Sequence, residues 1–191
     1  YQLGCEFPSK ALAGVGVAFY LLANLSSHRS KLNKSVAKMT QYLDLVALGT
    51  YADVASLDFN NRILVDAGVK PIQSSQCRSG ILALLDIAGR DPNDLKAQDL
   101  GFVIGPRMNA AGRMDTMNIG IECLLAEDMQ TAYAFARQLN ELNLERRSVE
   151  TEMKQEALSV IDQLEFDQDQ LPSALIMFEE HWHQGVIGIV A

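Results

Sequence analysis

The chain has 191 residues, of which 48% are hydrophobic and 21% charged, and its formal net charge is −8. This composition can bury a sizeable core, so it excludes a largely disordered or fibrous protein. No stretch approaches the roughly 20 consecutive apolar residues that a membrane-spanning helix needs. The acidic charge gathers in residues 141–180, which hold eleven acidic and three basic residues, whereas residues 1–40 hold one acidic and five basic residues. The acidic total argues against nucleic-acid binding, and its uneven distribution weakens that argument without removing it.

The three cysteines, Cys5, Cys77 and Cys123, are scattered and form no CxxC pair. They are typical of small buried apolar residues in a reducing compartment, so we expect a soluble cytoplasmic protein. The sequence begins at Tyr1 and ends within the apolar run 185–191. A natural terminus is usually polar, and we therefore expect an internal piece of a longer protein.

The first half of the chain is predicted to be largely helical. One helix is expected to begin near Ser9, a candidate N-cap, and to continue to about Ser26. Residues 42–48 are apolar on nearly all sides, which predicts a buried segment that ends at Gly49 and Thr50. Two more helices and a turn are expected over residues 60–67, 78–89 and 91–94.

A long helix is the main feature expected in the second half. Residues 100–104 form a short apolar run that Gly105 and Pro106 interrupt. Asp128 is then a candidate N-cap for a helix that continues to about Leu164. Such a helix would be about 50 Å long, and its single apolar stripe and acidic face are typical of a helix that connects two domains.

The last part of the chain is expected to be a linker and the start of a second domain. Residues 166–172 have the composition of a linker, and residues 174–178 favour a buried strand. The β-branched content of residues 185–191 also favours a strand.

Asp53 is the first candidate for chemistry. It follows the buried run and the Gly49–Thr50 turn, where the backbone is held rigidly and a side chain can face a cleft. A carboxylate in that place suits a hard cation such as Mg²⁺ or Mn²⁺. The alternative is that Asp53 caps the next helical turn, and the pattern alone favours the cap.

The second candidate comprises Arg107, Asn109 and Arg113, which lie among small residues in the segment 105–114. Guanidinium groups bind phosphate oxygens through paired hydrogen bonds, and small neighbours let a ligand approach closely. Solvated arginines at a helix start, or an ion pair with Asp115, explain the pattern equally well.

The third candidate is the pair His181 and His183 beside Trp182, the only tryptophan. An HxH pattern can bind a metal, but without a neighbouring carboxylate it is a weak signal. An ordinary packed His–Trp pair is favoured by the pattern. Trp182 and Tyr51 could stack on a base, and packing explains each equally well.

Several stretches together resemble one known family, in order and from Leu12 to Ala191. They are residues 12–19, 44–54, 61–62, 105–114, 143–147 and 182–191. These stretches resemble the RecJ family of single-stranded-DNA-specific exonucleases, within the DHH phosphoesterase superfamily. Tyr51 stands where the family usually has a small β-branched residue, but the nearby aspartate, Asp53, is retained.

The resemblance implies an α/β fold in three parts. Residues 1–128 would be the C-terminal part of a DHH domain, 129–165 the connecting helix, and 166–191 a linker and the start of a DHHA1 domain. The family's first three metal-binding motifs are absent and are expected before Tyr1. The final run resembles the start of a helix in the family, in contrast to the strand that its composition favours.

The resemblance also implies a reaction. In the family, Mn²⁺ or Mg²⁺ activates a water that attacks the terminal phosphodiester of single-stranded DNA from the 5′ end, in DNA repair and recombination. Asp53 matches the fourth-motif metal ligand, a catalytic residue. Arg107, Asn109 and Arg113 match a segment that lines the cleft and would contact the substrate, and His183 would lie near it. One carboxylate cannot hold a metal pair, so the chain alone is expected to be inactive.

Single-stranded DNA is the implied partner, with a single-strand-binding protein and a RecQ-type helicase as candidate protein partners and no membrane. Two alternatives stay open. One is a DHH-type phosphodiesterase for short oligonucleotides or cyclic dinucleotides. The other is a nucleic-acid-binding scaffold without catalysis, against which the retained Asp53 argues.

Overall fold

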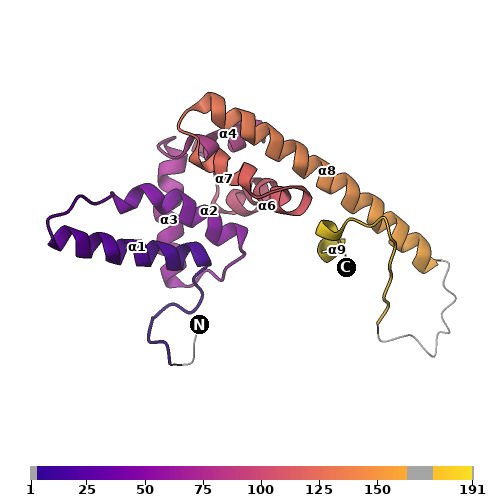
Figure 1. Cartoon of the computed structure of the whole chain (residues 1–191), viewed down its shortest axis with the longest axis horizontal. Coiled ribbons are helices and arrows are strands. Elements are labelled where there is room, and N and C mark those ends of the chain that lie inside the picture. The colour runs from indigo at the N-terminus through magenta and orange to yellow at the C-terminus, as the bar shows by residue number, and fades with distance from the viewer. Residues whose placement is uncertain (1–3, 163–173, 191) are drawn as a thin grey trace.

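The computed structural model describes residues 4–162 and 174–190, which are helical or irregular and contain no strand. A helical body is crossed by one long helix that extends well beyond it (Figure 1). The α-helices are α1 Gly14–Lys31, α2 Leu43–Ala52, α3 Phe59–Gln73, α4 Ser79–Ile87, α5 Ala97–Asp99, α6 Gly105–Met114, α7 Asn118–Leu125, α8 Met129–Asp162 and α9 Gln184–Val190. Short helical turns lie at Met39–Tyr42 (η1), Pro92–Asp94 (η2) and Leu100–Ile104 (η3, a π-turn). In the described part, none of the helices combines the length and the apolar character that a membrane span requires.

The centre of the body is the close crossing of α2 and α3. Val46 and Ala47 of α2 are almost completely buried, as predicted for this apolar segment. A Cβ atom at Gly68 of α3 would lie 2.1 Å from the backbone oxygen of Leu43. The two backbones therefore approach more closely than any side chain at position 68 would permit, which places α2 firmly against α3.

The first half of α8 covers the body along α4, α6 and α7. Ala132, Ala136 and Leu139 are fully buried there. Asp128 accepts hydrogen bonds from the backbone nitrogen and the hydroxyl of Thr131, at 2.8 and 2.7 Å. The predicted N-cap and long helix are thus confirmed, and 34 residues make a helix about 50 Å long.

The N-terminal helix begins and ends later than predicted. Its N-cap is Ala13, without a side-chain cap, and the helix continues to Lys31. Ser9 instead donates to the Oδ2 atom of Asp58 over 2.6 Å. The expected cap was wrong because the Ser9 hydroxyl is used by a partner 49 residues away, which local pattern cannot reveal.

Two predicted interruptions lie inside or at the start of helices. Gly49 and Thr50 are part of α2, where the Thr50 hydroxyl donates to the carbonyl of Val46 at 2.7 Å. Gly105 and Pro106 begin α6, a position that tolerates proline because the first amides of a helix have no intrahelical acceptor. The run 100–104 is one turn of π-helix that leads directly into α6.

The strand expected at residues 174–178 is wrong. These residues are irregular, and the side chains of Ile176 and Phe178 are 92% and 81% exposed. The prediction assumed a buried partner, and the described residues contain no strand to pair with them. The α/β class is accordingly not confirmed. Residues 184–190 are helix α9, as the family resemblance implied, and the linker expected at 166–172 lies outside the described residues.

Candidate functional site

Asp53 is the C-cap residue of α2, and its side chain is exposed. Its carboxylate has no hydrogen-bond or ion-pair partner among residues 4–162 and 174–190. The cap of the next helix, α3, is Asp58, whose Oδ1 atom accepts from the backbone nitrogen of Asn61 at 2.9 Å. The alternative that Asp53 caps the following turn is therefore wrong, and its carboxylate is left available for another group.

Hydrogen bonds fix the loop after Asp53 to the neighbouring helices. Val54 has a positive φ of 51°, and the backbone nitrogen of Ala55 donates to the carbonyl of Thr50 at 3.1 Å. The buried Asn61 amide donates to the carbonyls of Ser56 and Ala11, both at 2.8 Å. These bonds tie the loop to α3 and to the N-terminal segment, so Asp53 stands on a fixed backbone.

An exposed carboxylate oxygen is a suitable ligand for Mg²⁺ or Mn²⁺. Within the described part of the chain, however, no group of three or more His, Cys, Asp or Glu side chains is arranged to hold a metal ion. Asp53 could thus supply one ligand, and the described residues do not complete a metal site around it.

Helix α6, which contains the predicted arginine segment, begins close to the end of α2, where Asp53 lies. A Cβ atom at Gly105 would lie 3.5 Å from the Cβ of Ala52, so α6 begins beside the end of α2. Arg113 lies eight residues later, about 12 Å along the helix axis. The metal-ligand candidate and the arginine therefore lie towards opposite ends of one short helix.

One side of α6, from Pro106 to Arg113, forms a pocket with α8 and α9. Its volume is about 220 Å³, and it is lined by Pro106, Asn109, Arg113, Arg146 and Ile189. Asn109 and Arg113 were singled out from the sequence, and both are exposed. Two guanidinium groups and an amide in one pocket favour an anion with several oxygen atoms.

Arg146 is the lining residue that residue-by-residue reasoning missed. Its side chain is only 14% exposed, and it forms an ion pair with Glu150 at 2.5 Å. The Nε atom is buried and has no hydrogen-bond partner among the described residues. Because Arg146 lies in an acidic stretch of α8, its charge gave no sign of an anion site in the sequence. The only signal for it was its place in the family-like stretch 143–147.

Arg107 points away from this pocket, towards α8. Its Nε atom donates to Asn140 at 3.0 Å, and Nη1 donates to the carbonyl of Val103 at 2.7 Å. Burial, and then the nearby Arg147, lower the pKa of Arg107. The two predicted arginines of α6 thus have different surroundings, one half-buried and held by α8 and one exposed at the pocket.

His183 lies at the start of α9, close to Arg113. Its Nδ1 atom accepts from the backbone nitrogen of Gly185 at 3.1 Å, so the proton of the neutral ring is on Nε2. Arg113 in turn donates to the carbonyl of Gly185 at 3.0 Å. The structure therefore brings His183 and Arg113 together at the end of α6, with Asn109 one turn earlier on the same helix.

His181 and Trp182 share a carboxylate that the sequence did not reveal. Both side chains hydrogen-bond to the Oε2 atom of Glu156 on α8, each at 2.8 Å. These bonds, with Trp182 as the larger cause, lower the pKa of Glu156. The HxH pattern is thus split: His181 faces α8, and His183 caps α9.

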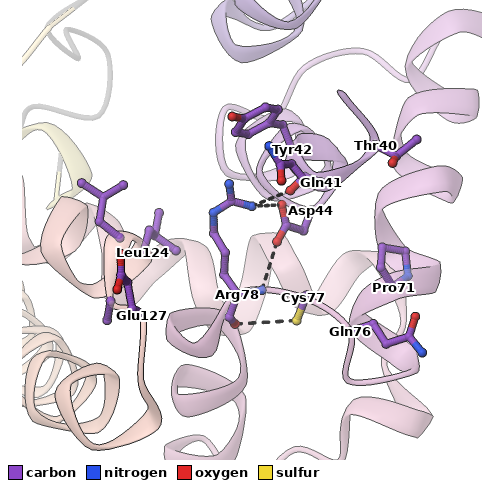
Figure 2. A pocket seen from close by; sticks show the side chains of 12 residues that line it. Thr40, Gln41, Tyr42, Asp44, Pro71, Gln76, Cys77, Arg78, Leu124 and Glu127 are labelled. Carbon is purple, nitrogen blue, oxygen red and sulfur yellow. Dashed lines mark hydrogen bonds and ion pairs between the residues drawn. The ribbon is translucent and has the colours of Figure 1, made fainter. Parts of the chain in front are cut away.

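Another pocket, with a volume of about 530 Å³, lies between α2, α3, α4 and the end of α7. Figure 2 shows Arg78 reaching towards Asp44 and Gln41, with Tyr42 beside it. Asp44 is 3% exposed and also accepts from the backbone nitrogen of Arg78 at 3.2 Å. Arg78 and Asp44 form an ion pair with each other, and this pair links α2 to the start of α4 inside the pocket.

The fold is that of nuclease structures already solved. An exonuclease RecJ bound to manganese superposes with a TM-score of 0.80 at 33% identity, covering 99% of this chain and 45% of that one. RecJ from Thermus thermophilus in complex with Mg²⁺ gives a TM-score of 0.78 at 32% identity, covering 97% of this chain and 27% of that one. The described helices thus have the arrangement of part of a RecJ exonuclease.

Sequence comparison leads to the same proteins. The chain is 51% identical to the single-stranded-DNA-specific exonuclease RecJ of Dickeya dadantii, over 98% of its own length and 34% of that relative. It is 33% identical to RecJ of Bacillus subtilis, over 100% of this chain and 22% of the relative. No family model matches. The chain spans about a third of the length of the first relative, and the resemblance to RecJ is confirmed over nearly all of this chain.

Proposed function

We propose that this chain is part of a metal-dependent exonuclease that degrades single-stranded DNA from the 5′ end, in DNA repair and recombination in the cytoplasm. The observation that carries the proposal is the similarity to RecJ along 98% of the chain, at 51% identity. The pocket of arginines along α6 supports it, because a polyphosphate needs cationic contacts that an acidic protein must concentrate locally.

Within that enzyme, residues 1–128 form the C-terminal part of a DHH domain, residues 129–165 the connecting helix, and residues 166–191 a linker and the start of a DHHA1 domain. The two ends of α8 support this division. Its first half contributes Ala132, Ala136 and Leu139 to the core, whereas Glu156 in its second half bonds to His181 and Trp182 just before α9.

Asp53 supplies one oxygen ligand to Mn²⁺ or Mg²⁺ in this proposal. A bound metal would lower the pKa of a water and neutralise charge that develops on the phosphate. Asp53 suits the role because its carboxylate has no partner among the described residues and its backbone is held by the 54–61 loop. The remaining ligands come from outside the described residues, so the chain alone is inactive.

Arg113 and Asn109 contact backbone phosphates of the DNA strand along α6. One Nη1 bond of Arg113 goes to Gly185, which orients the guanidinium and leaves other N–H groups for phosphate oxygens. His183 adds a donor through Nε2. Arg107 has two of its five N–H groups occupied by Asn140 and Val103, and we propose that it contacts the substrate outside this pocket.

We propose a single-strand-binding protein and a RecQ-type helicase as its protein partners. A nuclease restricted to single strands acts on duplex DNA only after another protein has separated the strands. No membrane takes part.

The test uses the complete protein with 5′-phosphorylated single-stranded DNA and Mn²⁺ or Mg²⁺. We expect mononucleotides from the 5′ end of single strands, none from a duplex, and no cleavage by the Asp53→Asn variant. That change is nearly isosteric on an exposed side chain, so the circular dichroism spectrum and the melting temperature should stay the same. Asp94→Asn, on another exposed carboxylate, is the matched control.

Three results would contradict the proposal. Full activity of the Asp53→Asn variant would remove the metal role of Asp53. DNA binding without cleavage under all conditions would support the scaffold, and cleavage confined to very short oligomers would support the small-substrate phosphodiesterase.

A further inference from the structure

Two sets of hydrogen bonds join the segment 181–190 to α8 and to α6. On α8, the Oε2 atom of Glu156 receives hydrogen bonds from both His181 and Trp182. On α6, Arg113 donates to the carbonyl of Gly185. Figure 1 shows α9 beside the far half of α8, with α6 on its other side.

The contact with α6 is backbone against backbone. A Cβ atom at Gly185 would lie 2.1 Å from the backbone oxygen of Arg113. Val186, the next residue, is fully buried. These two residues fix where α9 begins, and one turn further on Ile189 becomes a wall of the arginine pocket.

Glu156 lies outside that pocket. It is neither a lining residue nor a partner of Arg113, and within the described part of the chain its carboxylate bonds to His181 and Trp182. The pair with His181 is exposed, so alone it would contribute little. The indole N–H of Trp182 converges on the same oxygen, and a charged acceptor shared by two donors holds both rings in one orientation.

From these contacts we infer that Glu156 is a positioning residue: by holding His181 and Trp182 it keeps α9 against α6 and so completes the arginine pocket. The docking of α9 follows from the described contacts alone. The consequence for DNA binding rests on the proposed function, so the two are tested by separate measurements.

The first measurement is hydrogen exchange of the α9 amides in the 191-residue chain. Glu156→Ala removes the shared acceptor, and we expect exchange of the 186–190 amides to become about three- to tenfold faster. Glu156→Gln keeps an oxygen for the Trp182 N–H and should restore most of the protection. Glu152→Ala is the control, because Glu152 lies one turn earlier on α8 and its bond goes to Ser148 within the helix.

Fluorescence provides an independent reading, because Trp182 is the only tryptophan. Iodide should quench it more strongly in Glu156→Ala than in the parent chain or Glu152→Ala. Equal exchange and equal quenching in all four proteins would overturn the inference. Both Glu→Ala changes favour helix, so a loss of α8 is not expected and would be visible by circular dichroism.

The second measurement is made on the complete protein, with single-stranded DNA as substrate. Glu156→Ala should raise KM about three- to tenfold and change kcat less, and Glu156→Gln should rescue it. Faster exchange of α9 with unchanged KM would show that docking exists but does not serve the pocket, which overturns the positioning role. An inactive parent enzyme would instead contradict the proposed function and leave the exchange result standing.

Discussion

The two halves of α8 have the same helical backbone and different surroundings. In the first half, Ala132, Ala136 and Leu139 are fully buried against α4, α6 and α7. In the second half, Met153 and Ala157 are the buried residues, and α9 is the neighbour. The first half of α8 is part of the core, and the second half packs against α9. Changes in the first half should therefore affect global stability, and changes around the second half should affect docking.

The largest effect is expected for Leu139→Ala. Leu139 is fully buried in the core cluster, and truncation leaves a cavity that costs about 2–5 kcal/mol of the free energy of unfolding. Denaturant unfolding of the 191-residue chain measures it. Leu144→Ala on the exposed face of the same helix should cost far less, and equal losses would show that the first half is not part of the core.

Next comes Arg113→Ala, which tests the pocket that the second half helps to form. Losing a charge-assisted phosphate contact should weaken binding of single-stranded DNA to the complete protein by about 1–3 kcal/mol. The slope of log affinity against log salt should fall by about 0.7 for one contact on a single strand. Arg137→Ala, an exposed arginine on the first half of α8, is the control. Identical losses of DNA affinity in the two variants would mean that Arg113 acts only through non-specific charge and not through a phosphate contact.

Val186→Ala should have a smaller and more local effect. Two buried methyl groups are lost, about 1–2 kcal/mol at roughly 0.8 kcal/mol each. Because Val186 belongs to α9, the loss should appear as faster amide exchange in α9. The unfolding midpoint of the body should stay unchanged, and a large shift in that midpoint would mean that α9 and the body unfold together.

The smallest effect is expected from the cap of α8. Hydrogen bonds from the backbone and the side chain of Thr131 lower the pKa of Asp128 in the folded chain. The ionised cap therefore stabilises the protein above the unfolded pKa of 3.8, and this contribution is lost as the pH falls through the lower folded pKa. The difference in melting temperature between the parent and Asp128→Ala should shrink across that window, and a constant difference would contradict the cap.

Sequence signals that act over a few residues predicted the fold well. The Asp128 cap and the apolar 42–48 run both correspond to observed helices because their determinants lie within one or two turns. The strand at 174–178 was wrong, because a short apolar run indicates an apolar environment but not which element provides it. Helix α7 had no comparable local signal and was missed.

The candidate site was predictable in its residue types and less so in its geometry. Asp53 and Asp58 are five residues apart and look equally suited to capping, yet Asp58 caps α3 and Asp53 is free of partners among the described residues. Arg107 and Arg113 lie on one helix, but Asn140, 33 residues further on, holds only Arg107. Glu156 acquires its role from His181 and Trp182, 25 and 26 residues away.

The backbone contact between Gly185 and Arg113 has a consequence for how the pocket can change. Since no side chain separates the two segments, α9 cannot slide along α6 or tilt by a small step without a collision or a lost hydrogen bond. Arg113 forms one wall of the pocket and Ile189 forms another. The width of the pocket is thus set by the backbone contact that seats α9 on α6, and not by the length of a side chain between them.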